Sequence, residues 1–205
     1  MAESQSILPR IIYVFSGKRK SGKDFVTMLL QKRFGSRSII LRLSGPLKEQ
    51  YAKQHNLDYN RLLDATEYKE QHRAAMIKWG EEMRKKDKGY FCRLAIREAE
   101  NHHDVWIISD ARRKSDIEYF KKEYPKQMVT VRVEADLEIR MRRGLVPTKG
   151  IDDAPSECGL DKYSPWDVMI RNNGGQEQLH LEKQLEILAF MAERTEKDDG
   201  DDKAR

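Results

Sequence analysis

The sequence predicts an α/β fold in which a parallel sheet of about five strands is covered by helices on both faces. Five short apolar segments are rich in β-branched and aromatic residues, and longer amphipathic segments separate them. The strand-like segments are apolar almost throughout, which is typical of parallel strands that are buried on both faces. Strands that alternate with helices predict a doubly wound topology.

Each expected element has its own signal. The first strand, IIYVF, is a short apolar run that ends at Ser16 and Gly17. The apolar spacing i, i+3, i+4, i+8 from Val26 to Phe34 predicts the first helix. The expected strands are residues 11–15, 39–43, 105–109, 128–133 and 168–170, and the expected core helices are residues 26–34, 115–122 and 176–194.

The length of 205 residues predicts one domain, because a domain has about 150 residues as a soft prior. The segment between the second and third strands has no strand signal and predicts three or four inserted helices. A polar segment rich in Gly and Pro follows the fourth strand, and it is either an active-site lid or a passive surface loop. We expect one domain over 1–195 with a core of 11–45, 104–143 and 166–194, the helical insert at 46–103, the lid at 144–165, and a disordered acidic tail at 196–205.

The formal charge is +5, and the acidic tail leaves the rest of the chain more basic still. A basic surface favours anionic partners: nucleic acid, a membrane surface or phosphorylated small molecules. The two cysteines lack metal-ligand spacing, so we expect no zinc site and free thiols in a reducing compartment. No apolar run suits a signal peptide or a membrane span, and the last residues, Lys203-Ala204-Arg205, are no peroxisomal signal. We therefore expect a cytosolic protein.

The strongest motif, GKRKSGKD, directly follows the first strand and opens the first helix. Its spacing is G-x-x-x-x-G-K, that of a phosphate-binding P-loop. Glycines permit backbone turns that aim N–H groups at an anion, and the helix N-terminus favours phosphate. The alternative is a chance Gly-Lys turn on a basic loop. The expected nucleotide-binding residues are Gly17, Lys18, Arg19, Lys20, Ser21, Gly22, Lys23 and Asp24.

Two carboxylates are candidates for magnesium binding. Asp24 stands where P-loops usually have Ser or Thr, and Asp110 directly follows the third strand. Carboxylate oxygens suit Mg²⁺, either directly or through water. Arg112 and Arg113 follow Asp110 and offer planar donor forks for phosphate. The alternative is a solvated turn in which Asp110 caps the next helix.

Further cations are candidates for the transition state and the acceptor. Arg140 and Arg143 precede the expected lid and are expected to neutralise charge on the transferred group. Arg132 lies within the fourth strand, where a charge needs a partner or a cleft. Most cations of the insert are expected to be solvated, but a subset is expected to line the acceptor pocket. The candidate acceptor residues are Lys48, Lys69, Arg73, Arg84, Arg93, Arg112 and Arg113.

The chain closely resembles animal-type phosphomevalonate kinase over residues 11–190. The stretches LSGPLKEQ and ECGLD are far more specific than a P-loop alone. The stretches that carry the resemblance are residues 15–27, 41–51, 79–82, 109–110 with 112–113, and 156–161.

This resemblance implies a P-loop fold like that of nucleoside-monophosphate kinases. It implies ATP-dependent transfer of a phosphoryl group to (R)-5-phosphomevalonate with Mg²⁺, a step of isoprenoid and sterol biosynthesis. It also implies that ATP is bound by residues 18–24, Arg143 and Asn173 and that the acceptor is bound by Asn172. Asn173 stands where relatives carry His. Asn-Gly at residues 173–174 is, as an alternative, a simple turn signature.

The acceptor is itself a phosphate, so catalysis needs alignment and charge neutralisation rather than a strong base. The candidate catalytic residues are Lys23, Arg19, Asp110, Arg112, Arg113, Arg140 and Arg143. Another small-molecule or nucleoside-monophosphate kinase of this fold is the second hypothesis. A nucleic-acid-binding module is the third, but the basic residues are dispersed and no aromatic recognition motif accompanies them. We expect a monomer that binds neither nucleic acid nor membranes.

Overall fold

The computed structural model describes residues 8–63, 67–97, 99, 102–175 and 178–201, and the chain forms two compact units. We call Met1–Leu41 with Ala99–Arg205 the sheet unit, and Arg42–Glu98 the helical unit. The predictions for the first seven and the last four residues lie outside the described part of the chain. Among the described residues, no helix is long and apolar enough to cross a lipid bilayer.

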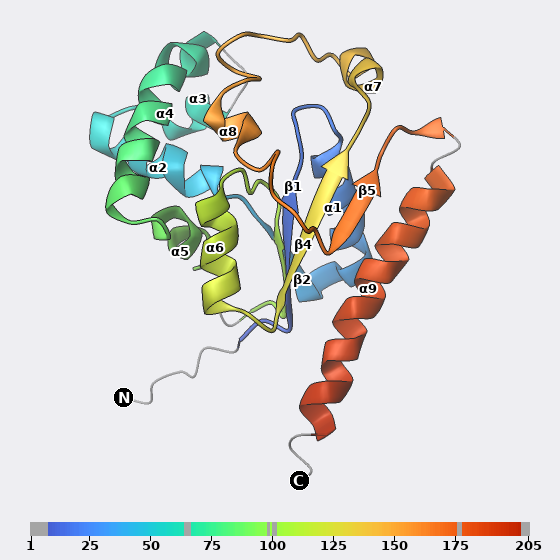
Figure 1. Cartoon of the computed structure of the whole chain (residues 1–205). Coiled ribbons are helices and arrows are strands. Elements are labelled where there is room, and N and C mark those ends of the chain that lie inside the picture. The colour runs from blue at the N-terminus through green and yellow to red at the C-terminus, as the bar shows by residue number, and fades with distance from the viewer. Residues whose placement is uncertain (1–7, 64–66, 98, 100–101, 176–177, 202–205) are drawn as a thin grey trace, which may run out of the picture. The chain divides into compact units, whose positions relative to one another are not determined.

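A five-stranded, fully parallel sheet forms the centre of the sheet unit, as predicted (Figure 1). The strand order is β2-β3-β1-β4-β5. The second strand ends two residues earlier than predicted, because the chain turns there and the N–H of Gly45 bonds to the carbonyl of Arg42. The strands are β1 Ile11–Ser16, β2 Ser38–Leu41, β3 Val105–Ile108, β4 Met128–Glu134 and β5 Val168–Arg171.

Strand register brings the carboxyl ends of the central strands to one edge. β1 lies between β3 and β4, with Val14 opposite Ile108 and Ser16 opposite Arg132. The loops that follow β1, β3 and β4 therefore emerge side by side, and in an open parallel sheet this edge holds the ligand.

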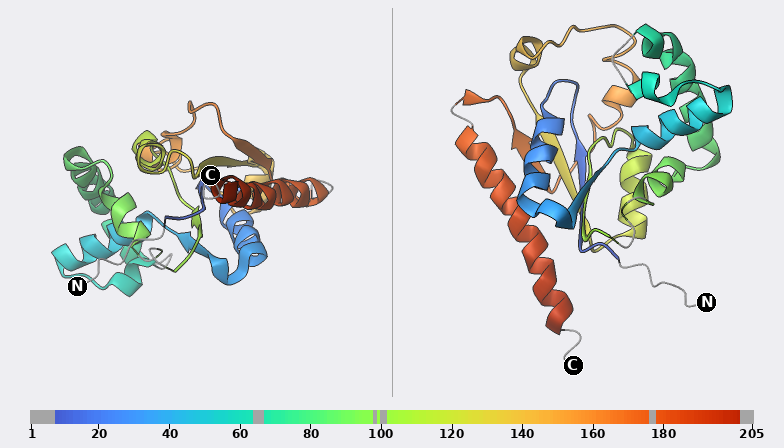
Figure 2. Two further views of the ribbon diagram at one scale, coloured as in Figure 1. Left: turned by 90° about the horizontal axis from the view of Figure 1, so that it is seen from below. Right: turned by 180° about the vertical axis from the view of Figure 1, so that it is seen from behind.

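Helices cover both faces of the sheet, as the two views of Figure 2 show. Helices α1 (Lys23–Phe34) and α9 (Gln178–Asp201) lie on one face, and α6 (Lys114–Glu123) packs against β4 on the other. Shorter elements are η1 (Gly35–Arg37), α7 (Leu137–Arg142) and α8 (Pro155–Cys158). The main core consists of Ile11, Tyr13, Phe15, Val26, Leu30, Val105, Ile107, Val131, Val133, Val168, Ile170, Leu181, Leu185, Leu188 and Ala192.

Helix α9 extends further than the sequence predicted. The prediction placed a disordered tail from residue 196, whereas the helix continues to Asp201. Extending an existing helix adds one hydrogen bond for each residue fixed, so it needs no new nucleation.

Within the described residues, the helical unit consists of four helices and has its own core. The helices are α2 (Ser44–His55), α3 (Tyr59–Leu63), α4 (Glu67–Lys86) and α5 (Tyr90–Ile96). Tyr51, Ala52, Leu62 and Met76 are buried together in this core. That this unit binds the acceptor stays a prediction.

Candidate active site

The P-loop connects β1 to α1 and depends on two glycines. A Cβ added at Gly17 would lie 2.6 Å from the carbonyl oxygen of Val133. Gly22 has a φ of 83°, and an added Cβ there would lie 2.2 Å from Nδ2 of Asn172. Both positions therefore exclude a side chain. The loop lines a cavity of about 460 Å³, whose lining residues are Gly17, Lys18, Arg19, Lys20, Ser21, Gly22, Lys23, Asp24, Arg112 and Arg143. All eight predicted loop residues thus share one cavity.

Lys23 is buried at the start of α1, and its ammonium group reaches across to β3. It donates a hydrogen bond to the carbonyl of Ser109, the residue after that strand, and another of 2.9 Å to Oδ1 of Asp24. The side chain of Asp24 is itself 71% exposed. The predicted phosphate-binding lysine therefore lies beside the position from which Asp110 extends.

Arg112 interacts electrostatically with several charged residues of the site. Burial lowers the pKa of its guanidinium below the ordinary value, although the carboxylates of Asp110 and Asp24 raise it and the cations Arg113 and Arg19 lower it further. The predicted strand-end and P-loop residues are thus close enough to interact electrostatically.

The backbone that carries the two strand-end arginines is fixed by α6. The carboxylate of Asp116 accepts the backbone N–H groups of Arg112 and Arg113 at 3.0 and 3.1 Å. One alternative from the sequence was that Asp110 caps this helix. In the structure Asp116 makes the capping contact.

Asp24 and Asp110 suit a magnesium ion chemically, because both offer carboxylate oxygens and both act on the same guanidinium. Phosphate oxygens supply the remaining ligands of Mg²⁺ in phosphoryl-transfer enzymes.

The expected lid contributes three carboxylates that the sequence analysis missed. Asp152 accepts two hydrogen bonds of 3.1 Å from Nη1 of Arg19. Asp161 lies 2.5 Å from Nζ of Lys18, and Glu157 pairs with Arg112. In the sequence this segment stands out for its Gly and Pro content and for the family stretch ECGLD, which contains Glu157 and Asp161, but no role was predicted for the three acids. Three cations expected to face phosphates are therefore paired with lid carboxylates in this structure.

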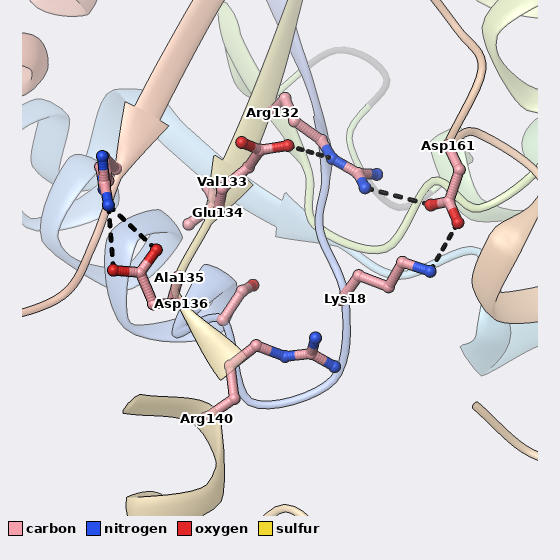
Figure 3. Close-up of a pocket in the computed structure, with 10 residues that line it drawn as sticks. Lys18, Arg132, Val133, Glu134, Ala135, Asp136, Arg140 and Asp161 are labelled. Carbon is pink, nitrogen blue, oxygen red and sulfur yellow. Dashed lines mark hydrogen bonds and ion pairs between the residues drawn. The ribbon is translucent and has the colours of Figure 1, made fainter. Parts of the chain in front are cut away.

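Arg132 has the partners that its place within β4 requires. It donates to Oγ of Ser16 at 3.2 Å and to Oδ1 of Asp161 at 3.3 Å, and its guanidinium lies 5.7 Å from the ring centroid of Trp166. Figure 3 shows the side chains of Arg132 and Lys18 converging on Asp161. They border a second cavity of about 520 Å³, lined by Lys18, Ser21, Arg132, Val133, Glu134, Ala135, Asp136, Arg140, Asp161 and Arg171.

The predicted clamp arginines contact the P-loop backbone. Nε of Arg140 donates to the carbonyl of Arg19 at 2.8 Å, and Nη1 of Arg143 donates to the carbonyl of Ser21 at 3.0 Å. Their contact with phosphates stays a prediction. Asn173, predicted to serve ATP, exchanges two hydrogen bonds of 2.9 Å with Asp136 at the start of α7.

The acceptor candidates of the helical unit have varied surroundings. Arg84 is buried, and its guanidinium lies 4.5 Å from the ring centroid of Phe91. Arg73 pairs with Glu70, and Arg93 pairs with Asp87. Lys48 and Lys69 are half-buried on α2 and α4. Their role in binding the acceptor stays a prediction.

The Lys18–Asp161 pair predicts a defined pH dependence of stability. Burial opposes both charges, but the hydrogen bond between them raises the pKa of Lys18 above its ordinary value and holds the pKa of Asp161 below its ordinary value. Cys158 shifts both pKa values in the same directions, and Arg132 also lowers that of Asp161. The contribution of Asp161 is therefore present above about pH 4 and is lost as the pH falls through its lowered pKa; that of Lys18 is lost only above its raised pKa.

We expect Asp161→Asn to lower the free energy of unfolding by about 0.5 kcal/mol, since the pair is about one-third exposed. Urea unfolding should give the same difference at pH 5.5 and pH 7 and a smaller one near pH 3. Asp153, whose carboxylate accepts a backbone N–H from Gly150, supplies the control Asp153→Asn. A difference that changes between pH 5.5 and pH 7 would contradict this assignment of the charges.

Comparison with known proteins agrees with the geometry. Residues 15–126 match the family model described as phosphomevalonate kinase. A Drosophila melanogaster protein named phosphomevalonate kinase is 42% identical over 184 residues, which cover 88% of this chain and 97% of the relative. The chain belongs to the phosphomevalonate kinase family. The resemblance seen in the sequence is thereby confirmed.

Solved structures support the fold of this family member. Protein TT1252 from Thermus thermophilus is 18% identical, with a TM-score of 0.51 over 91% of this chain and 98% of that chain. The APS kinase CysC from Mycobacterium tuberculosis, in complex with AMPPNP and APS, is 13% identical, with a TM-score of 0.50 over 91% and 99% of the two chains. At these identities the likeness concerns the fold alone, which is that of P-loop small-molecule kinases.

Proposed function

We propose that this chain transfers the γ-phosphoryl group of ATP to the phosphate of (R)-5-phosphomevalonate, giving (R)-5-diphosphomevalonate and ADP. The observation that carries the proposal is the family match: the relative covers 88% of the chain, and the family model covers residues 15–126, which include the P-loop and both strand-end arginines. A phosphate oxygen of the acceptor attacks the γ-phosphorus while the bond to the β–γ bridging oxygen breaks, and ADP leaves with that electron pair.

The charges around the P-loop cavity suit two anionic substrates. Two unit charges 4 Å apart repel by about 4 kcal/mol at an effective dielectric near 20, so cations are needed between the reacting phosphates. Lys23 and Arg112 line the same cavity, and Arg19 and Arg113 act on Arg112 electrostatically. Mg²⁺ held by Asp24 and Asp110, directly or through water, would neutralise further charge on the β- and γ-phosphates.

The proposal includes a role for the lid. Residues 144–165 close over the substrates, which keeps water from the γ-phosphate. The pairs that join Asp152 and Asp161 to the P-loop support this, because each is partly exposed and costs little to exchange for a phosphate. We also propose that the protein is cytosolic and monomeric.

A coupled assay of ADP release tests the reaction. Phosphomevalonate, AMP, CMP and dephospho-coenzyme A are supplied in turn with MgATP. We expect release above the ATP-only background with phosphomevalonate alone. A response to AMP or CMP without one to phosphomevalonate would instead establish a nucleoside-monophosphate kinase of the same fold.

A further inference from the structure

We propose that Asn172 is a positioning residue of the P-loop and acts through the loop rather than by contact with the acceptor. The resemblance implied an acceptor contact, but the structure directs this side chain into the protein. The inference concerns the same site as the proposed function, and it rests on that function because the P-loop is taken to bind the ATP of the proposed reaction. Its decisive measurement is nucleotide binding, which does not require the acceptor to be known.

The polar groups of Asn172 are engaged within the protein. The residue follows β5 and is 5% exposed. Its side-chain Nδ2 donates to the carbonyl of Ser21 at 3.0 Å, and its backbone N–H donates to the carbonyl of Glu134 at 2.8 Å. Its own carbonyl and Oδ1 accept from Nη2 of Arg143 at 2.9 and 3.4 Å. Because the residue is almost fully buried, contact with a substrate would require the groups around it to move.

These bonds orient the amides of the P-loop. Across a planar trans peptide the carbonyl and the next N–H point in opposite directions. Because Asn172 and Arg143 both hold the carbonyl of Ser21, the N–H of Gly22 points away from them. Arg143 also holds the carbonyl of Lys20 at 3.4 Å. The held carbonyl of Ser21 thus fixes the direction of the Gly22 amide, whereas the N–H of Ser21 donates to the carbonyl of Lys18 at 3.1 Å. Backbone N–H groups with fixed directions form anion-binding nests.

Asn172 also fills the space beside the most permissive residue of the loop. Gly22 has positive φ, and its Cα region lies so close to Nδ2 of Asn172 that no Cβ fits between them. A glycine loses more conformational freedom than any other residue when it is ordered. Without the side chain of Asn172, the backbone at Gly22 gains room to move, and the carbonyl of Ser21 loses one of its two described side-chain hydrogen bonds and keeps the one from Arg143.

The test compares nucleotide binding with acceptor binding in Asn172→Ala. We expect the Kd of MgADP, measured by calorimetry without acceptor, to rise about tenfold, which corresponds to about 1.4 kcal/mol. The KM of phosphomevalonate at saturating ATP should stay within about twofold of the wild-type value. Asn172→Leu, which retains the branched shape of the side chain in a somewhat larger volume, should show the same weakening of ADP binding and serves in its place if the alanine variant does not fold.

Ser38→Ala is the matched control for lost stability. Ser38 is a buried polar residue at the start of β2, where its hydroxyl donates to the carbonyls of Gln31 and Gly35. This variant should lower Tm and leave the Kd of MgADP unchanged. An unchanged Kd for ADP in the Asn172 variants, whether Tm falls or the KM of the acceptor rises, would overturn the proposal. If phosphomevalonate proves not to be the acceptor, the ADP measurement still decides the role of Asn172.

Discussion

Lys23→Met should lower kcat at least a hundredfold, about 2.7 kcal/mol of barrier, while the protein stays folded. The methionine keeps the length and apolar stem of the side chain and loses only the ammonium group. That group lies between Asp24 and the carbonyl of Ser109, at the start of α1 in the P-loop cavity. A cation at this position stabilises the charge that develops on the transferred phosphoryl group.

Single-turnover and steady-state assays of Lys23→Met, with a thermal melt of the same samples, provide the measurement. Lys32→Met is the control on the same helix, because Lys32 is exposed in the last turn of α1. It should keep the wild-type kcat. A Lys23 variant that melts like wild type and turns over at a similar rate would remove the P-loop from the mechanism.

The features that follow from local pattern were predictable from the sequence. Five apolar runs gave the five strands within a few residues, and the spacing of the P-loop placed its eight residues around one cavity. Each of these signals lies within about ten consecutive residues, so the local sequence is enough to predict the local structure. The end of β2 was misplaced, because Leu43 continues the apolar pattern after the chain has turned.

The partners of the cations could not be predicted in the same way. Lys18 and Asp161 are separated by 143 residues, and no periodicity or motif links them. Their approach depends on how far the segment after α7 folds back toward the P-loop, which is set by tertiary packing. Exposed acids in a Gly- and Pro-rich segment are by default solvated. Composition therefore gave no reason to select Asp152, Glu157 or Asp161.

The hydrogen-bond acceptors of Arg140 and Arg143 also could not be predicted from the sequence. Their charge and position before the lid predicted a clamp on phosphates, yet in the structure they donate hydrogen bonds to carbonyl oxygens of the loop. A guanidinium has five N–H donors, so it can bond to carbonyl oxygens as well as to phosphates. The sequence shows only that two guanidinium groups are available to the P-loop region. Only the structure shows which acceptors they meet.

Arg112→Met is expected to lower kcat by at least a hundredfold as well, again about 2.7 kcal/mol. Arg112 is the strand-end cation that lines the P-loop cavity, where it interacts with Asp24 and Asp110. Burial lowers its pKa below the ordinary value, but guanidinium has so high a pKa that it remains charged at neutral pH. We therefore expect this fixed positive charge, beside the proposed magnesium ligands, to act on the transferring phosphoryl group.

Arg112→Lys separates charge from shape, because lysine keeps the charge and loses the planar fork. Its kcat should lie between those of the methionine variant and the wild type. Arg33→Met is the matched control, since Arg33 forms a partly exposed ion pair with Glu182, outside the cavity. It should leave kcat unchanged. If Arg112→Met retained kcat within threefold of wild type, the charge on this arginine would have no part in the transfer, and its pairing with Glu157 would be purely structural.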